Sequence, residues 1–314
     1  MKRTALLLAI IAVAAVPWVI RSVGWRPSYM LQLASLLPVW FVAALSETVI
    51  AGFGGQVSVG QAGFMAVGAY TTGLLVGSLG WSWGPSILVG TLTSMAAAGI
   101  VGVPALRVRG PYFVMASLAF GGMAYTVAVN WVEVTGGPGG LRNLQPPPFE
   151  RVGVHPDVGV YYILWLAAFA AIAFVRWFRD TPLGRSLMAV REDELAAAAV
   201  GIHVTLVKSL SFMAAGAVAG LAGALLALFI GSVTPDAFGI NQSLLILTQV
   251  LIGGLDRISG AIVGTVLLLV VSELLRDFAQ FQLLIYGVIM LAVVLFFPRG
   301  IVGALVARRR SSAA

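Results

Sequence analysis

The chain has 314 residues, of which 60% are hydrophobic and only 10% are charged, and its mean hydropathy is +0.99. This composition excludes a water-soluble surface and is typical of a helical protein that crosses the membrane several times. The net charge of +7 is attributed to membrane topology and contact with anionic lipid, not to nucleic acid, and the lack of cysteine excludes disulfides and thiolate metal sites.

Ten apolar segments are candidate membrane spans, because a helix needs roughly 20 apolar residues to cross a hydrocarbon core of about 30 Å. They are residues 5–20, 30–50, 62–79, 85–106, 111–132, 159–177, 207–233, 243–255, 261–275 and 283–297. The eighth and ninth segments are short and could form one bent hairpin. We therefore expect an all-α, single-domain membrane protein over residues 1–314, with about ten transmembrane helices.

Lysine and arginine predict the orientation of these spans, because positively charged loops stay on the cytoplasmic side. With the N-terminus inside, 14 of the 19 basic residues are cytoplasmic, and the outside holds only Arg21, Arg26, Arg142, Arg151 and Arg276. Both termini are therefore expected in the cytoplasm. The first segment also resembles a signal peptide, whose removal would leave nine spans, but the charge distribution favours a retained helix.

Motifs for catalysis or ATP binding are missing from the sequence: it has no P-loop, no HExxH zinc motif and no GxSxG nucleophile elbow. His155 and His203 lack metal-ligand spacing and are interpreted as surface histidines. Glu47 and Glu273 are expected near the ends of their spans, whereas a stand-alone secondary transporter would carry carboxylates at mid-depth. A secondary transporter and an intramembrane enzyme are therefore both disfavoured.

Glycines interrupt the apolar pattern between Ala51 and Tyr70, so a continuous helix is not expected there. Non-helical backbone at membrane depth occurs only where it is buried in protein or lines a wet cavity, so this break indicates a transport site. A half-helix beginning near Gly60 would direct free N–H groups at an anionic ligand such as a carboxylate. The alternative is a plain glycine-rich cytoplasmic turn. The candidate pathway residues are Gln56, Ser58, Gly60, Gln61, Tyr70 and Ser117.

Small residues in the seventh segment predict close helix packing. Gly216, Gly220 and Gly223 recur among alanines, which is the small-residue pattern that lets two helix backbones approach each other. Residues 134–159 are rich in glycine and proline and are expected to form an irregular external loop. That loop either contacts an extracytoplasmic partner or is an inert connector.

Residues 176–208 form a polar segment that carries a large share of the charge. Thr181 can cap a helix that starts at Pro182, and Gly201 suits the position just after its end. One helix is expected over residues 182–200, or two short ones around Gly184. A continuous helix would align a ridge on one face, formed by Leu187, Val190, Glu194, Ala198 and Gly201. Such a ridge could seat in a groove of another protein, or the helix could lie on the bilayer surface.

Several stretches can be compared with known families: GGQVSVGQAGFMAVGAY, RVRGPYFVMASLAFGGM, TGGPGGL, GRSLMAVREDELAAAAVGI followed by TLVKSLSFMAAGAVAGLAGALLA, LIGGLDRISGAIVGT and LIYGVIMLAVVLFFPRGIVG. Together, in register and in order, they resemble the branched-chain amino acid ABC transporter permeases of the LivM type. The sequence departs from the usual pattern of this family at two places. Residues 256–259 lie where family members usually have an uncharged glycine-rich stretch, and Glu47 lies in a region that is commonly apolar or carries an amide. They leave the substrate open, with urea, short amides and small organic acids as alternatives.

The resemblance implies an importer of the cell inner membrane in which this chain forms half of the pathway and works by alternating access. Its partners would be a similar second permease, two cytoplasmic ATPases and a periplasmic or lipid-anchored binding protein. ATP and magnesium would bind to the ATPases, so this chain is expected to be no enzyme and to hold no cofactor or metal. By position, residues 191–201 resemble the EAA motif that docks on the ATPase. The coupling residues so implied are Arg191, Glu192, Asp193, Glu194, Ala197, Ala198 and Gly201.

Overall fold

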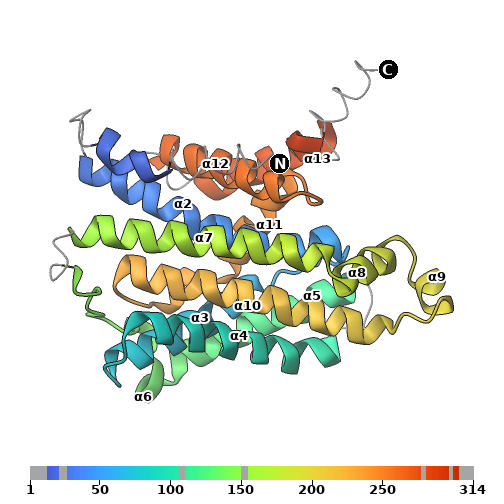
Figure 1. Cartoon of the computed structure of the whole chain (residues 1–314), viewed down its shortest axis with the longest axis horizontal. Coiled ribbons are helices and arrows are strands. Elements are labelled where there is room, and N and C mark those ends of the chain that lie inside the picture. Colours follow the sequence, from blue (N-terminus) through green and yellow to red (C-terminus); the bar gives the residue numbers. More distant parts are fainter. Residues whose placement is uncertain are drawn as a thin grey trace.

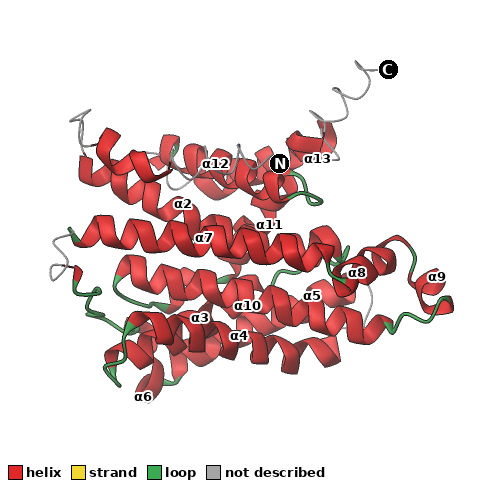
Figure 2. Cartoon of the chain, in the orientation of Figure 1, coloured by secondary structure: helices red, strands yellow, loops and turns green. Residues whose placement is uncertain are grey.

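The computed structural model describes residues 13–20, 27–105, 110–149, 155–276, 281–296 and 300–303. These residues form helices joined by short loops, and none of them lies in a β-strand beyond one isolated bridge between Leu141 and Val233 (Figures 1 and 2). The expected all-α class is therefore confirmed for the part of the chain that the structure describes.

Five helices are long and apolar enough to cross a membrane by themselves: α2 with its π-helical extension η1 (Pro27–Phe53), α4 (Trp83–Gly102 of Trp83–Ala105), α5 (Pro111–Asn130), α7 (Pro156–Asp180) and α10 (Val204–Ile230). They coincide with five of the expected spans. α3 (Gln61–Gly77) and α13 (Gln282–Phe296) also lie where spans are expected, but they are shorter, with 17 and 15 residues. Half of the first expected span, residues 5–12, lies outside the described residues, and residues 13–20 are helical.

The eighth and ninth expected spans form a bent pair. η4 (Pro235–Phe238) and α11 (Ile240–Gly253) meet α12 (Ile258–Leu274) at an angle of 117°, so the two helices together count as one broken span or a re-entrant loop. Glycines permit the bend: Gly254 has a φ of +117°, and a Cβ on Gly264 would lie 1.7 Å from the carbonyl oxygen of Gln249. With this pair, the described helices supply up to six spans by length and composition.

α10 lies at the centre of the bundle and packs against α2, α3 and α4 (Figure 1). Its small residues lie at these contacts. A Cβ on Gly220 would lie 2.3 Å from the Cβ of Ser94, and one on Gly223 would lie 1.9 Å from the carbonyl oxygen of Met65. Gly216 likewise lies against Ala98. Larger side chains at these three positions would force the helices apart, because a backbone atom, or a Cβ fixed to the backbone, cannot yield as the far end of a flexible side chain can.

The two ends of the bundle carry different connections (Figure 1). α7 runs between them, and at its C-terminal end the chain continues into two short helices, α8 (Pro182–Glu192) and α9 (Glu194–Ala199). The short elements α6 (Val132–Thr135) and η2 (Gly137–Gly139), which follow α5, lie at the opposite end. The polar segment and the glycine-rich loop are therefore separated by the length of the bundle.

Candidate functional site

The expected break in the helical pattern between Ala51 and Tyr70 is present. α2 (Pro27–Glu47) continues as the π-helix η1 (Thr48–Phe53), residues 54–60 are not helical, and α3 begins at Gln61. Glycine permits two close backbone contacts: a Cβ on Gly52 would lie 2.1 Å from the carbonyl oxygen of Leu255, and one on Gly60 would lie 2.6 Å from that of Ser117. The break is thus packed against the α11–α12 turn on one side and α5 on the other.

Aromatic rings hold the start of α3 in place one turn after the break. Phe64 stacks on Phe120 of α5 at a centroid distance of 4.4 Å and meets the edge of Phe212 of α10 at 5.3 Å. Phe113 of α5 contacts the same Phe212 ring at 5.8 Å. These buried rings fix the position of α3 relative to α5 and α10, because each ring fills a defined volume.

The start of α3 differs from the expectation of free N–H groups. The N–H of Val59 donates to Ser117 Oγ at 3.0 Å, that of Gly60 to Ser58 Oγ at 3.3 Å, and that of Ala62 to Ser243 Oγ at 3.1 Å. The physical reason is burial: a helix end shielded from water must find acceptors inside the protein. An anionic ligand would therefore have to compete with hydroxyl groups for these donors.

Glu47 belongs to the same buried cluster, and sequence reasoning missed it as a site residue. Its side chain is completely buried, and its Oε1 accepts the N–H of Ser58 at 3.1 Å. The position near the end of α2 suggested a residue close to water, but η1 extends the helix beyond it. The signal that could have identified it was its unusual charge in an apolar region.

Some polar atoms of the cluster have no hydrogen-bond partner among the described residues. These are Oε2 of Glu47 and Nε2 of Gln61, whose Oε1 lies 3.3 Å from the Ser46 hydroxyl. Both side chains are buried to 1% exposure or less. Leaving a buried donor or acceptor without a partner costs about 1–3 kcal/mol of folding free energy. These two atoms give the cluster hydrogen-bonding capacity that a ligand could use.

The six candidate pathway residues do not form one group. Ser58, Gly60, Gln61 and Ser117 lie in the buried cluster. Tyr70, further along α3, instead lines a mostly apolar groove of about 310 Å³ between α3, α5 and α6. Gln56 is only half-buried and lies in a different cavity, on the side of the polar segment.

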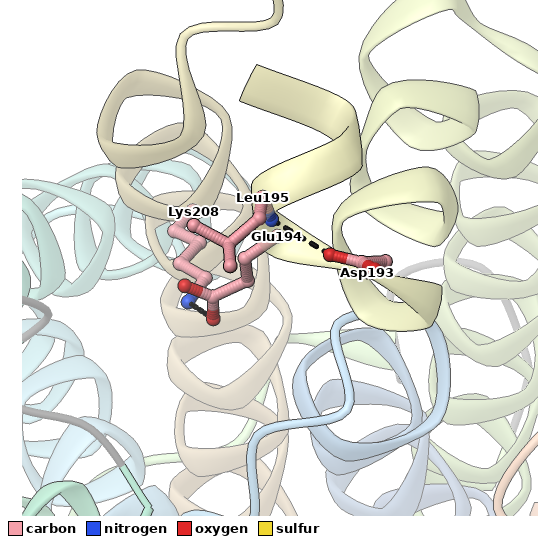
Figure 3. Close-up of polar contacts among 4 residues, drawn as sticks. All are labelled: Asp193, Glu194, Leu195 and Lys208. Carbon is pink, nitrogen blue, oxygen red and sulfur yellow. Dashed lines mark hydrogen bonds and ion pairs between the residues drawn. The ribbon is translucent and has the colours of Figure 1, made fainter. Parts of the chain in front are cut away.

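In the polar segment, Thr181 caps α8 as expected, because its Oγ1 accepts the N–H of Gly184 at 3.2 Å. Neither expected arrangement, one helix over residues 182–200 or two short ones around Gly184, is present: the helix is interrupted at Asp193. Asp193 has an extended backbone and caps α9: its Oδ1 accepts the N–H of Leu195 at 2.8 Å (Figure 3). The same oxygen accepts the N–H of Ala196 at 3.0 Å. Aspartate is favoured at the N-cap position because its carboxylate can accept hydrogen bonds from the free N–H groups at the start of a helix.

The break at Asp193 also removes the expected ridge. Leu187 and Val190 of α8 are buried against the bundle, whereas Ala198 and Gly201 are exposed. The five ridge residues therefore do not share one surface. What α9 does expose is Leu195, whose side chain is largely open to solvent, together with the small side chains of Ala196, Ala198 and Ala199, next to one buried alanine, Ala197.

An ion pair ties α9 to α10. The carboxylate of Glu194 contacts the ammonium group of Lys208, and the Lys208 side chain is only 5% exposed (Figure 3). Lys208 is thus interpreted as an internal support for α9. Asp193 and Glu194, although adjacent, have separate partners.

One cavity of about 300 Å³ brings the break and the polar segment together. Its walls come from residues 54–57 after η1, from the first turn of α5 and from residues 190–194, with Lys208 at the start of α10. Gln56, a candidate of the pathway, therefore faces the same space as Arg191, Glu192, Asp193 and Glu194, which are candidates for coupling.

Comparison with known proteins gives a family match over most of the chain. The family model described as the branched-chain amino acid transport system / permease component matches residues 29–297. The permease protein LivM of the high-affinity branched-chain amino acid transport system is 31% identical in Salmonella typhimurium and 30% identical in Escherichia coli K12. Each alignment covers 86% of this chain and 69% of the relative.

The second permease of the same system is also similar. The LivH protein of Escherichia coli K12 is 24% identical over 87% of this chain and 94% of its own length. No solved structure matches the chain.

Proposed function

Because the chain belongs to the family of permease components of branched-chain amino acid transport systems, we propose that it forms half of the pathway of an ABC importer for these amino acids. A similar second permease would complete the pathway. Two ATPases, which hold ATP and magnesium, would dock on the polar segment. A substrate-binding protein would deliver the amino acid from outside.

The observation that supports this proposal most directly is the shared cavity of about 300 Å³. An importer without its own motor must connect the surface that receives the ATPase with the residues that contact the substrate. In this chain the glycine break and the polar segment are direct neighbours, so a shift of α8 or α9 would change the surroundings of Gln56. A secondary transporter binds no ATPase, so its function would not require contact between the polar segment and the glycine break.

The test is transport in proteoliposomes that contain the chain with its second permease, its ATPases and its binding protein. We expect uptake of labelled leucine, isoleucine or valine that depends on ATP inside and on the binding protein outside. Competition by unlabelled urea, short amides and aromatic acids compares the alternative substrates. Uptake that follows a proton or sodium gradient without ATP would contradict the proposal and favour a secondary transporter.

We also propose about ten spans with both termini and the polar segment in the cytoplasm. The support is the asymmetry of basic residues, together with the separation of the polar segment from the 137–149 loop along the bundle. The chain has no cysteine, so single cysteines can be introduced without background. Asn143→Cys, which is exposed, should react with a membrane-impermeant maleimide in intact cells, and Ser311→Cys only after permeabilisation. The reverse pattern would invert the topology.

A further inference from the structure

Arg191 lies at the end of α8 and contacts two other segments of the chain. Its guanidinium donates to the carbonyl oxygen of Gly52 in η1, and its Nη1 lies 2.6 Å from Oδ1 of Asp256 in the turn between α11 and α12. A guanidinium group suits this arrangement, since each of its terminal nitrogens carries two N–H groups, so Nη1 alone can donate to both acceptors. One side chain thus connects the polar segment with both interrupted helices.

Glycine brings these segments close enough to be connected. Gly55, with a φ of +67°, lies against the Arg191 side chain, where a Cβ would come within 2.8 Å of Cγ. Gly52 in turn lies against the carbonyl group of Leu255, next to Asp256. The backbone of the break, the α11–α12 turn and the end of α8 therefore form one packed unit.

Stabilisation of the fold is a poor explanation for this ion pair. The Asp256 side chain is 62% exposed and that of Arg191 is 33% exposed, and ion pairs open to solvent contribute only about 0–1 kcal/mol. The position of the contact, between α8 and the two helix interruptions, indicates its role instead. Asp256 lies on a bent helix pair that packs against α2, so a displacement of α8 would move two helix interruptions together.

We propose that Arg191 is a positioning residue, which through its contacts with Gly52 and Asp256 transmits movement of the polar segment to both helix interruptions. The proposal rests on the proposed function, because it assigns a path for movement that an ATPase starts. It predicts that loss of the Asp256 carboxylate uncouples ATP hydrolysis from transport without preventing assembly.

The experiment compares Asp256→Ala with Asp256→Glu in the complete complex in proteoliposomes, measuring amino acid uptake and ATP hydrolysis on the same vesicles. We expect Asp256→Ala to lower the amount transported per ATP at least fivefold, with normal assembly and thermal stability. Asp256→Glu keeps a carboxylate within reach of Arg191 and should restore most of the coupling. Arg257→Ala is the matched control: it removes the neighbouring charge, which makes no ion pair with the described residues, and should leave the ratio unchanged.

Three outcomes would overturn the proposal. If the Asp256→Ala complex keeps a transport-to-ATP ratio within twofold of the native value, this inference is contradicted. The proposed function is then unaffected, because the native complex still transports. A loss of assembly or stability in that variant, with the remaining complex fully coupled, assigns the ion pair a structural role instead. A native complex with no ATP-driven uptake contradicts the proposed function and this inference with it.

Discussion

Replacing Ala198 with tryptophan is expected to abolish ATP-driven uptake while the chain still inserts and folds. Ala198 is exposed on α9, at the surface proposed to receive the ATPase, so the ring has room in the isolated chain but not at a fitted interface. Overpacking of a fitted contact costs about 1–3 kcal/mol, and every 1.4 kcal/mol changes an affinity tenfold. The measurements are copurification of the ATPases and uptake into proteoliposomes.

The matched control is Ala198→Ser, which adds one hydroxyl group and should leave uptake close to native. The yield of each variant after detergent extraction of the membranes measures its membrane insertion. Native uptake in Ala198→Trp would mean that α9 is not the docking surface, and would return the polar segment to the interpretation of a helix on the bilayer surface.

Replacing Gln61 with leucine is expected to lower uptake about tenfold or more without destabilising the chain. The amide nitrogen of Gln61 is buried and has no partner among the described residues. The Ser46 hydroxyl, 3.3 Å from Gln61 Oε1, lies only 2.7 Å from the carbonyl oxygen of Ala43, so it keeps an acceptor. The Gln61 side chain also lies near the Glu47 carboxyl group, but without a hydrogen bond of normal geometry, so folding loses only this weaker contact. Hydrogen bonds to charged groups such as a zwitterionic substrate contribute about 1.5–3 kcal/mol each, so the effect on uptake should be larger.

Gln249→Leu provides the control for this change. Gln249 is another buried glutamine, and its Oε1 has no hydrogen-bond partner in the described part of the chain, but it lies on α11 and lines a separate cavity between α2 and α12. Its replacement should leave uptake near native while the thermal stabilities of the two variants stay similar. Uptake within a factor of two of native in Gln61→Leu would identify the break as a plain turn.

The sequence predicted where the helices lie more reliably than what their side chains face. Long apolar runs, the glycines before Gln61 and the cap at Thr181 are local signals, and the structure has helices, a break and a cap at these places. The break at Asp193 was also a local signal, but an aspartate among acidic residues fits the inside of a polar helix as well as its start. Only the packing of α8 against the bundle decides between them.

The sequence alone could not show which candidate pathway residues are buried in the cluster and which face the polar segment. Gln56 and Gln61 are five positions apart, yet one faces the polar segment and the other is buried. That difference depends on how η1 ends and on which helices cover the break, and both are set by contacts between distant parts of the chain. The burial of Glu47 has the same origin, because its partner is the N–H of Ser58 beyond the break.

The ion pair between Glu194 and Lys208 has a consequence for how this family can evolve. With Lys208 only 5% exposed, loss of Glu194 would leave a buried charge without its partner. Removing one member of a buried pair costs about 3–5 kcal/mol, with the lower value more suitable here because Glu194 is 31% exposed. Such a cost is a large part of the stability of a domain. Lineages that replace one of these two residues are therefore expected to have replaced the other as well, so that positions 194 and 208 covary as one inherited unit.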